Sequence, residues 1–388
     1  MKACDSCPIC GEAPLKPLIS IPDVPALCNR LCASEIEAAD FPRGDISLAY
    51  CTECGHVINA AFDQARVNYD ERFENTLTFS PQFRRYAEAT ADRLIDRYGL
   101  IGKRIVEIGC GGGDFLSLLC SPGNYGAGYD PSQPSSRYGA GGGTVEISGR
   151  NFAAKDARGA EFVCCRHVLE HLFEPMNLLW QLHESMAIRP GGVVFFEVPN
   201  GLFILDRLSI WDIIYEHVSY FMPSSLARAF HAAGFTVECA RSDFDDQYLW
   251  VEARVGGEAS ASGVPPRPSD LLYSSFNERF RERLERWQQR IDELRSNRRD
   301  VVIWGAGAKG VMFLNLLKVS AGAGIDRVVD INPRKHGHFI PLMGQRIVSP
   351  DSLRQNPPDL VIVMNAEYQH EIRCMINDVG VACEVVSA

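Results

Sequence analysis

The sequence predicts a multidomain α/β protein in which a doubly wound, mostly parallel sheet follows a small metal-binding module and precedes a second, smaller α/β unit. Three observations predict this class. Strand-like apolar runs alternate with helical patterns over residues 63–255, glycine-rich loops follow strands near residues 109 and 305, and two Cys-x-x-Cys pairs lie toward the N-terminus. Strands that alternate with helices form mostly parallel sheets with helices on both faces.

The composition is that of an ordinary globular protein and argues against two classes of partner. The chain has 388 residues, too many for one hydrophobic core, so two or three domains are expected. Its net charge of −10 argues against a nucleic-acid partner, which requires clustered Lys and Arg. No run approaches the roughly 20 apolar residues of a membrane span. The N-terminal residues contain no apolar signal region, so we expect a cytoplasmic protein.

Residues 1–62 are predicted to form a zinc-binding domain. Cys7 and Cys10, and then Cys51 and Cys54, each present two sulfurs on one tight turn, and two such pairs form a tetrahedral thiolate site. Because the protein fills all four positions, the Zn²⁺ is expected to be structural. The competing ligands, none of which belongs to an equally well matched pair, are Cys4, Cys28, Cys32 and His56.

Residues 63–255 are predicted to form the large α/β domain. A helix is expected after Ser80, which can cap it, with Pro81 in its first turn and Gly99 at its end. A second helix is expected at 224–233. The strand-like runs are 104–109, 125–129, 161–165, 193–198, 235–240 and 247–254. Since only a turn separates the last two runs, an antiparallel edge is expected.

Residues 256–299 are predicted to be a linker rich in Gly, Ser and Pro followed by an amphipathic helix. The apolar residues of this helix recur every three or four positions, which is typical of one face packed on a neighbour. They are Leu272, Phe276, Phe280, Leu284, Trp287 and Ile291. Residues 300–388 then begin a new α/β unit with a strand, a glycine loop and a helix.

The first glycine loop, RIVEIGCGGGDFLSLL, is predicted to bind a cofactor. A strand ends in Glu107, and Gly109, Gly111 and Gly113 lead into an amphipathic helix, so a ligand can lie against the backbone at the helix N-terminus. About 20 residues further on, Asp130 ends the next strand, where it can accept hydrogen bonds from a ribose diol. This pattern resembles the S-adenosylmethionine (SAM) site of class I methyltransferases. A dinucleotide-binding loop would have Gly at position 114, where this chain has Asp.

The second glycine loop, Gly305-Ala-Gly307-Ala-Lys309-Gly310, has the complete G-x-G-x-x-G spacing. Asp330 ends the strand that follows it. On spacing alone the loop is an NAD-binding fingerprint, so an NAD-dependent oxidoreductase is an alternative function. The other interpretation is a strand–turn–helix junction that needs small residues only for packing. The C-terminal unit is little more than half the size of a dinucleotide domain.

The order of these features resembles the three-part C-methyltransferases that act on nucleotide-linked 4-keto-deoxysugars. The matching stretches are CRHVLEHLFEPMNLL, IYEHVSYF, AKGVMFLNLL, VVDINPRKHGHFIPLMG and PDLVIVMNAEYQHEI. The resemblance implies SAM as cofactor, a small-molecule substrate that is a nucleotide-linked sugar, and a C-terminal unit that helps to hold this sugar and does not bind NAD. Family members commonly have Tyr-His-Glu-His where this chain has Ile-Tyr-Glu-His, and Tyr-x-Tyr where it has Phe73 and Asn75.

Glu216 and His217 are predicted to be the catalytic pair. They lie together in an otherwise aromatic and aliphatic run, WDIIYEHVSYF. C-methylation next to a ketone requires a base for the acidic α-proton, and imidazole is suited to this task near neutral pH. Glu216 is expected to orient the ring. The alternatives are that His217 binds the substrate or bonds a neighbouring loop; His171 is a further candidate, for a structural or cofactor-lining role.

The sequence thus predicts a SAM-dependent methyltransferase whose cofactor lies over Gly109–Gly113 with its ribose on Asp130. The backbone at Cys165 and Arg166, which ends the fourth strand, is expected to line the same pocket. The favoured reaction is C-methylation of a nucleotide-linked keto-deoxysugar through an enolate. The alternatives are O- or C-methylation of another glycan or natural-product intermediate, the oxidoreductase, and a zinc-ribbon binding module without catalysis.

Overall fold

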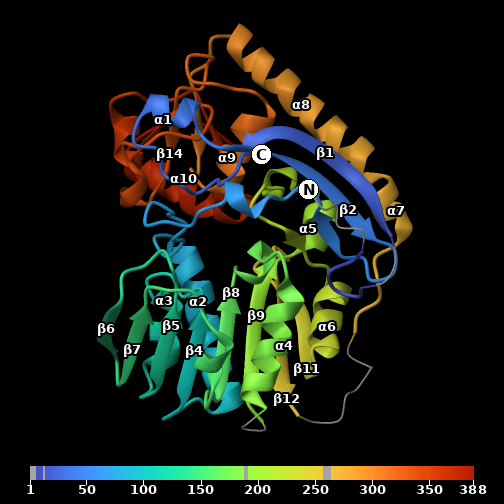
Figure 1. Cartoon of the computed structure of the whole chain (residues 1–388). Helices are drawn as coiled ribbons and strands as arrows, with labels where there is room; N and C mark the ends of the chain where they lie inside the picture. The colour runs from blue at the N-terminus through green and yellow to red at the C-terminus, as the bar shows by residue number, and fades with distance from the viewer. Residues whose placement is uncertain (1–5, 12–13, 188–190, 257–263) are drawn as a thin grey trace.

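Three β-sheets form the framework of the protein. The structure, a computed structural model, describes residues 6–11, 14–187, 191–256 and 264–388. Cys4 and most of the Gly/Ser-rich start of the predicted linker lie outside the described residues. In Figure 1 the eight-stranded sheet occupies the lower half, and the N-terminal four-stranded and C-terminal five-stranded sheets lie above it. No helix in the described ranges is both long and apolar enough to cross a membrane.

The N-terminal sheet is antiparallel and has the order β1-β2-β3-β10. Its strands are β1 (Leu15–Pro25), β2 (Arg43–Cys51), β3 (Val57–Asn59) and β10 (Ser219–Tyr220), and helix α1 (Glu35–Ala39) lies between β1 and β2. Strand β10 comes from within the predicted 63–255 domain and pairs with β3. The sequence does not indicate this pairing, because a two-residue strand has no periodicity to detect.

The eight-stranded sheet has the order β11-β12-β9-β8-β4-β5-β7-β6. Its strands are β4 (Arg104–Ile108), β5 (Tyr125–Tyr129), β6 (Ser136–Ala140), β7 (Gly143–Ser148), β8 (Phe162–Arg166), β9 (Val193–Pro199), β11 (Phe235–Asp243) and β12 (Tyr248–Val255). Its helices are α2 (Pro81–Tyr98), α3 (Asp114–Cys120), α4 (Pro175–Met186), α5 (Gly201–Asp206) and α6 (Pro223–Ala232). The expected antiparallel pair, β11 and β12, is confirmed at one edge. The hairpin of β6 and β7 at the other edge was not predicted.

Successive residues in the central strands belong to opposite faces of this sheet. Ile105 and Phe162 pack with α2 and α3, whereas their neighbours Val106 and Val163 pack with α4 and α6. Both faces are therefore buried, which explains why the strands are continuous apolar runs rather than alternating ones. The chain order reverses at β4, between β5 and β8, and ligands of open α/β sheets bind beyond the carboxyl ends of strands at such a point.

Helix α2 begins and ends where the sequence predicts. The Ser80 side chain accepts a hydrogen bond from the backbone N–H of Phe83, and Pro81 occupies the first turn. Gly99 follows the last turn with φ of 56°, a left-handed conformation that glycine adopts without steric cost. Local capping chemistry therefore determines both ends of this helix.

The C-terminal sheet is wholly parallel, with the order β15-β14-β13-β16-β17. Its strands are β13 (Val301–Trp304), β14 (Arg327–Val329), β15 (Arg346–Val348), β16 (Leu360–Val363) and β17 (Glu384–Ser387), and its helices are α9 (Ala308–Leu316) and α10 (Gln369–Asp378). The chain order reverses at β13, so the loop that follows β13 is also at a switch point.

The predicted amphipathic helix joins the N-terminal and C-terminal sheets. It consists of α7 (Asp270–Ser274) and α8 (Phe276–Ser296), and α8 extends along β1 in Figure 1. The buried face of α8 belongs to one hydrophobic core that also contains Leu18 of β1 and Val311 of α9. The two small sheets are therefore packed as one body above the large sheet.

We expect Phe276→Ala to lower the free energy of unfolding by about 3–5 kcal/mol, because it leaves a cavity in this shared core. Phe276 is fully buried, whereas Leu271, one turn earlier, is 72% exposed. Leu271→Ala is the matched control and should change stability by less than about 0.5 kcal/mol. Urea unfolding followed by circular dichroism measures both. Equal losses in the two variants would contradict the packing described for α8.

Candidate active site

The sulfur atoms of the two Cys-x-x-Cys pairs meet at one point. The Sγ atoms of Cys7, Cys10, Cys51 and Cys54 all lie within 4.8 Å of one another. The Cys7–Cys54 separation is 3.5 Å and the Cys10–Cys51 separation is 3.6 Å. Tetrahedral Zn²⁺ with Zn–S bonds of about 2.3 Å places its sulfurs about 3.8 Å apart, so the four positions fit zinc. Of the competing ligands, His56 instead contacts the Ser219 hydroxyl at 3.2 Å.

The glycine loop after β4 leaves open space above its backbone. A Cβ atom added at Gly111 or Gly112 would meet no atom within 4 Å. A Cβ atom at Gly109 would lie 2.2 Å from Cγ2 of Val168. Gly109 therefore allows close packing against the turn after β8, whereas the backbone at Gly111 and Gly112 is free to receive a ligand. This geometry fits the methionine part of SAM.

The Asp130 carboxylate lies at the end of β5 and already contacts the loop. Its Oδ2 accepts a hydrogen bond from the N–H of Gly111 (2.9 Å), and its Oδ1 accepts from the N–H and hydroxyl of Ser132 (2.9 and 2.6 Å). Each carboxylate oxygen has two lone pairs, so capacity remains for a ribose hydroxyl. Beneath the loop, burial raises the pKa of Glu107 to about 8, and its Oε2 has no hydrogen-bond partner among the described residues.

The side chains of Cys165 and Arg166 are engaged within the protein. Cys165 is buried in the core under α4 and α6. The Arg166 guanidinium donates to Oε1 of Glu197 on β9 (2.9 Å) and lies over the Phe115 ring of α3, 4.2 Å from its centroid. That the backbone of these two residues lines the cofactor pocket stays a prediction.

The β6–β7 hairpin contributes a side chain to the loop that the sequence analysis missed. The Tyr138 hydroxyl donates to the carbonyl oxygen of Gly112 (3.1 Å) and contacts the Ser117 hydroxyl (3.2 Å). A Cβ atom at Gly113 would lie 2.4 Å from the same hydroxyl. Tyr138 therefore covers one end of the glycine loop. Its only sequence signal is its place in a short polar run before a glycine-rich turn.

A cavity of about 320 Å³ lies between the large sheet and the C-terminal sheet. The turns after β8 and β9, the connector before α2, and the carboxyl ends of β13, β14 and β16 enclose it. The titratable residues that line it are His167, Glu170, His171, Asp212, Glu216, His217, Tyr248, Lys309, Asp330, Lys335, Tyr368 and Glu371. The glycine loop after β4 is not part of this lining. It is adjacent, because Val168, which covers Gly109, lies between His167 and Glu170 in the chain.

Glu216 and His217 both line the cavity, but they do not bond each other. Oε1 of Glu216 accepts from the backbone N–H of Cys28 (2.8 Å), while its Oε2 has no hydrogen-bond partner among the described residues. Burial raises the pKa of Glu216 to about 7. Burial lowers the pKa of His217 well below its usual value, and Nδ1 of His217 is also without a partner in the described chain. His217 is therefore a neutral imidazole at neutral pH, and Glu216 does not orient it through a direct hydrogen bond.

His171 packs against His217 and is itself tightly held. The two ring centroids are 4.9 Å apart in a T-shaped arrangement. Nδ1 of His171 is 3.0 Å from the carbonyl oxygen of Glu216 and 2.9 Å from the Tyr69 hydroxyl. Because a carbonyl oxygen can only accept, Nδ1 carries the proton and Nε2 has the lone pair. Burial lowers the pKa of His171 as well, so this ring is also neutral.

His167 is a lining residue that the sequence analysis did not single out. It follows β8 with φ of 55°, and its N–H donates to the carbonyl oxygen of Glu197 (2.8 Å). Its Nε2 lies 3.2 Å from Glu197 and its Nδ1 lies 3.7 Å from Glu170. Burial alone would lower the pKa of His167, but the two carboxylates outweigh burial and raise it to about 9. The sequence feature that could have indicated His167 as a site residue is its position directly after a strand of a parallel sheet.

The connector between β3 and α2 forms one wall of the cavity. Its lining residues are Phe73, Asn75, Thr76, Leu77, Phe79 and Ser80. At the end of this wall, Glu371 of α10 accepts hydrogen bonds from the Ser80 hydroxyl (3.0 Å) and the Gln82 N–H (2.9 Å). The C-terminal unit thus supplies a carboxylate at the N-terminus of α2, where the helix dipole stabilises negative charge.

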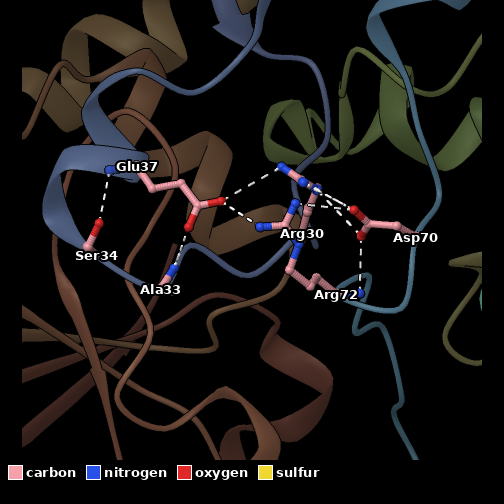
Figure 2. Close-up of polar contacts among 6 residues, drawn as sticks. All are labelled: Arg30, Ala33, Ser34, Glu37, Asp70 and Arg72. Atoms are coloured by element: carbon pink, nitrogen blue, oxygen red, sulfur yellow. Dashed lines mark hydrogen bonds and ion pairs between the residues drawn. The ribbon is translucent and has the colours of Figure 1, made fainter.

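An ion-pair cluster fixes the outer side of the connector to the N-terminal module, as Figure 2 shows. The Arg30 guanidinium lies 3.1 Å from Asp70, and Arg72 lies 2.8 Å from Glu37 and 3.3 Å from Asp70. These side chains are partly exposed, so each pair contributes little alone. Together with the hydrogen bond from Glu74 N–H to the carbonyl oxygen of Asn29 (2.9 Å), they hold the connector in one position.

The protein itself supplies hydrogen-bond acceptors for backbone N–H groups of the second glycine loop and of the turn after β14. Asp330 accepts from the N–H groups of Ala306 and Asn332, both at 2.8 Å. A Cβ atom at Gly310 would lie 2.0 Å from the carbonyl oxygen of Gly305, so Gly310 is required for packing of α9 on the loop. These contacts favour the interpretation of this loop as a structural junction that lines the cavity.

Sequence comparisons identify two domains in this chain. The methyltransferase domain family matches residues 83–240, and the C-methyltransferase C-terminal domain family matches residues 268–380. The ubiquinone biosynthesis O-methyltransferase of Aromatoleum aromaticum is 31% identical over 159 residues, which are 36% of this chain and 67% of that protein. The chain belongs to the SAM-dependent class I methyltransferases. Its C-terminal segment, which holds the second glycine loop, is a C-methyltransferase domain, so the oxidoreductase alternative receives no support.

One relative is similar to the chain along most of its length. C-methyltransferase NovU from Streptomyces niveus is 24% identical over 400 aligned residues, 95% of this chain and 91% of NovU. The protein is thus a SAM-dependent enzyme of the C-methyltransferase type. Among solved structures, magnesium protoporphyrin IX methyltransferase from Synechocystis, with 15% identity, has a TM-score of 0.35 over 47% of this chain and 89% of that one. Nothing further follows from a similarity at that level.

For the metal site, we expect about one Zn²⁺ per chain in purified protein and its loss in Cys51→Ser. The apolar residues of the N-terminal module pack in a core shared with α8 and α9. Because metal binding contributes to folding, the variant should also lose thermal stability. Cys374→Ser is the control, since Cys374 is exposed on α10. Elemental analysis by plasma mass spectrometry measures the metal. A folded, metal-free wild-type preparation would contradict a structural zinc site.

For the cofactor site, Asp130→Ala is expected to weaken binding of S-adenosylhomocysteine by about 1–3 kcal/mol, the usual cost of removing one partner of buried hydrogen bonds. Part of the loss in affinity would arise because the Gly111 N–H, which donates to Asp130, loses its acceptor in the variant. Asp92→Ala on the exposed side of α2 is the control. Isothermal titration calorimetry gives the affinities. If Asp130→Ala binds as tightly as the control, the ribose lies elsewhere.

Proposed function

We propose that this methyltransferase methylates a carbon atom next to the ketone of a nucleotide-linked deoxysugar, through an enolate. The C-methyltransferase C-terminal domain and the full-length similarity to NovU support transfer to carbon. The observation that carries the proposal is the position of His217. Its neutral imidazole lines a cavity adjacent to the glycine loop, and its buried Nδ1 has no hydrogen-bond partner among the described residues.

SAM, held over Gly111 and by Asp130, would supply an electrophilic methyl group on a sulfonium. His217 takes the α-proton of the substrate, and the electron pair of the C–H bond moves toward the ketone oxygen. The α-carbon then forms a bond to the methyl carbon as the methyl–sulfur bond breaks, which regenerates the ketone and leaves a thioether. The proton on His217 passes to solvent. Imidazole is suited to this role because burial keeps the ring uncharged until it takes the proton of the substrate.

The cavity walls support a nucleotide-linked substrate. Trp304, Tyr368 and Phe79 line the part near the C-terminal sheet and offer apolar faces on which a planar base can lie. Asn75 provides an amide group for a sugar hydroxyl, whereas the lining amide of Gln247 is already bonded to Asn365 of the C-terminal unit (3.1 and 2.9 Å). The sugar would therefore lie near His217 and the nucleotide near α9 and α10.

Transfer to oxygen is the second candidate, favoured by the similarity to an O-methyltransferase over the SAM-binding part of the chain. In that reaction His217 would deprotonate a hydroxyl group instead of a C–H group. The two candidates differ in one measurable property. Only the enolate route lets the enzyme exchange the substrate α-hydrogen with solvent without methyl transfer.

We expect His217→Asn to lower turnover by about 10²–10⁴-fold, the range for loss of a general base. The affinity for S-adenosylhomocysteine should not change, because His217 does not line the glycine loop. The assay is a mass increase of one methyl group on a panel of nucleotide-linked keto sugars. In deuterated water, wild-type protein should exchange the α-hydrogen with S-adenosylhomocysteine bound, and His217→Asn should not.

His183→Asn is a suitable control, because His183 lies on α4 against Phe235, away from the cavity. It should retain both methylation and exchange. If His217→Asn retains activity, His217 is not the base, and the interpretation of this histidine as structural is favoured. Methylation by wild type without any exchange would favour transfer to oxygen.

A further inference from the structure

His167 and His217 line the same cavity in opposite electrostatic surroundings. His217 has no carboxylate hydrogen bond, whereas the His167 ring lies between two carboxylates, Glu197 at 3.2 Å and Glu170 at 3.7 Å. The Glu197 side chain is fully buried, and that of Glu170 is 2% exposed. Neither oxygen of Glu170 has a hydrogen-bond partner among the described residues. An imidazolium at this position is therefore strongly favoured over a neutral ring.

The groups that face His167 come from several elements. Glu197 on β9 is itself paired with the Arg166 guanidinium at 2.8 Å and accepts a hydrogen bond from the Tyr86 hydroxyl of α2. The Tyr248 ring of β12 packs edge-on against the His167 ring at 4.6 Å. The Glu170 carboxylate also lies within 4.8 Å of a ring nitrogen of His171 and of His217, and burial lowers the pKa of both rings. The four charged groups, two carboxylates, one guanidinium and one imidazolium, balance one another.

The backbone of His167 is in a conformation that favours other residues. Its φ of 55° lies in the left-handed region, which few residues other than Gly adopt, although Asn, Asp and His do so more often than the rest. The hydrogen bond from its N–H to Glu197 (2.8 Å) and the register of β8 with β9 hold it there. Residues kept in such conformations cluster at functional sites, because the side chain is needed in that direction.

We propose that His167 is the cation that stabilises the enolate oxygen formed during C-methylation, an inference that rests on the proposed function. As His217 removes the α-proton, negative charge develops on the ketone oxygen. Nδ1–H of His167 donates a hydrogen bond to this oxygen, since its contact with Glu170 at 3.7 Å is longer than a hydrogen bond. His167 keeps its proton throughout, and the charge on oxygen returns to the α-carbon as the carbon–methyl bond forms.

The surroundings of the two histidines explain why we assign the role of base to His217 and the role of cation to His167. Burial lowers the pKa of His217, while the two carboxylates raise the pKa of His167 to about 9. Pairs of titratable groups whose pKa values are pushed apart in one site are typical of an acid and a base with separate roles. A neutral base removes the proton, and a preorganised cation receives the charge that results.

His167→Asn tests the proposal, because Asn tolerates the left-handed backbone but has no charge. We expect it to lower both solvent exchange of the α-hydrogen and methyl transfer by about 10²–10³-fold, the range for loss of one oxyanion donor. Binding of S-adenosylhomocysteine should be unchanged. His370→Asn, at an exposed position on α10, is the matched control and should behave as wild type.

Glu170→Gln provides a second readout that a merely structural role would not move. Wild-type turnover should fall as the pH rises through about 9, where His167 loses its proton. Removal of one facing carboxylate lowers the pKa of His167, so this alkaline limb should move to lower pH by about one unit. Histidine-selective NMR titration of the resting protein, assigned with His167→Asn, should show a protonated His167 at pH 7.5.

Three outcomes would overturn the inference. A neutral His167 at pH 7.5 by NMR does so independently of any substrate. Wild-type levels of exchange and methylation in His167→Asn overturn the role of His167 while the enolate route stands. A wild-type enzyme that neither exchanges nor methylates keto sugars overturns the enolate route, and the role of His167 with it.

Discussion

The turn that carries Glu216 and His217 depends on hydrogen bonds to distant parts of the chain, one of them outside the large domain. A buried turn must satisfy its own N–H and C=O groups. Val218 accepts from the N–H of Asn59 (2.8 Å) in the N-terminal module and donates to the carbonyl oxygen of Glu170 (2.9 Å) in the large domain. Strand β10, directly after the turn, completes the N-terminal sheet. The N-terminal module is therefore part of the candidate active site.

The candidate active site holds charged and neutral groups close together. The ends of β8 and β9 contribute the balanced set of Arg166, Glu197, His167 and Glu170. A carboxylate oxygen of Glu170 also lies within 4.8 Å of a ring nitrogen of His217. Burial nevertheless lowers the pKa of His217, because burial disfavours its charged form. Under the proposed function, His217 is the base and His167 receives the negative charge that develops on the neighbouring atom.

The connector before α2 makes one wall of the cavity largely apolar. Phe73, Leu77 and Phe79 line the cavity beside the amide of Asn75. The Tyr69 hydroxyl lies 2.9 Å from Nδ1 of His171, and Tyr69 is not among the lining residues. The resemblance drawn from the sequence implies tyrosines at positions 73 and 75, so this wall is where the chain departs from the pattern that the resemblance implies.

The sequence by itself determined the features that depend on neighbours along the chain. The caps of α2, the positions of most large-domain strands and the two cysteine pairs on tight turns follow from local backbone chemistry and periodicity, which act over a few residues. Only the tertiary structure decided that β10 joins the N-terminal sheet, that Glu216 bonds Cys28 instead of its neighbour, and that His167 lies between two carboxylates. These outcomes depend on which distant groups share a buried space, because burial and nearby charge set the protonation of a side chain and no short stretch of sequence contains that information.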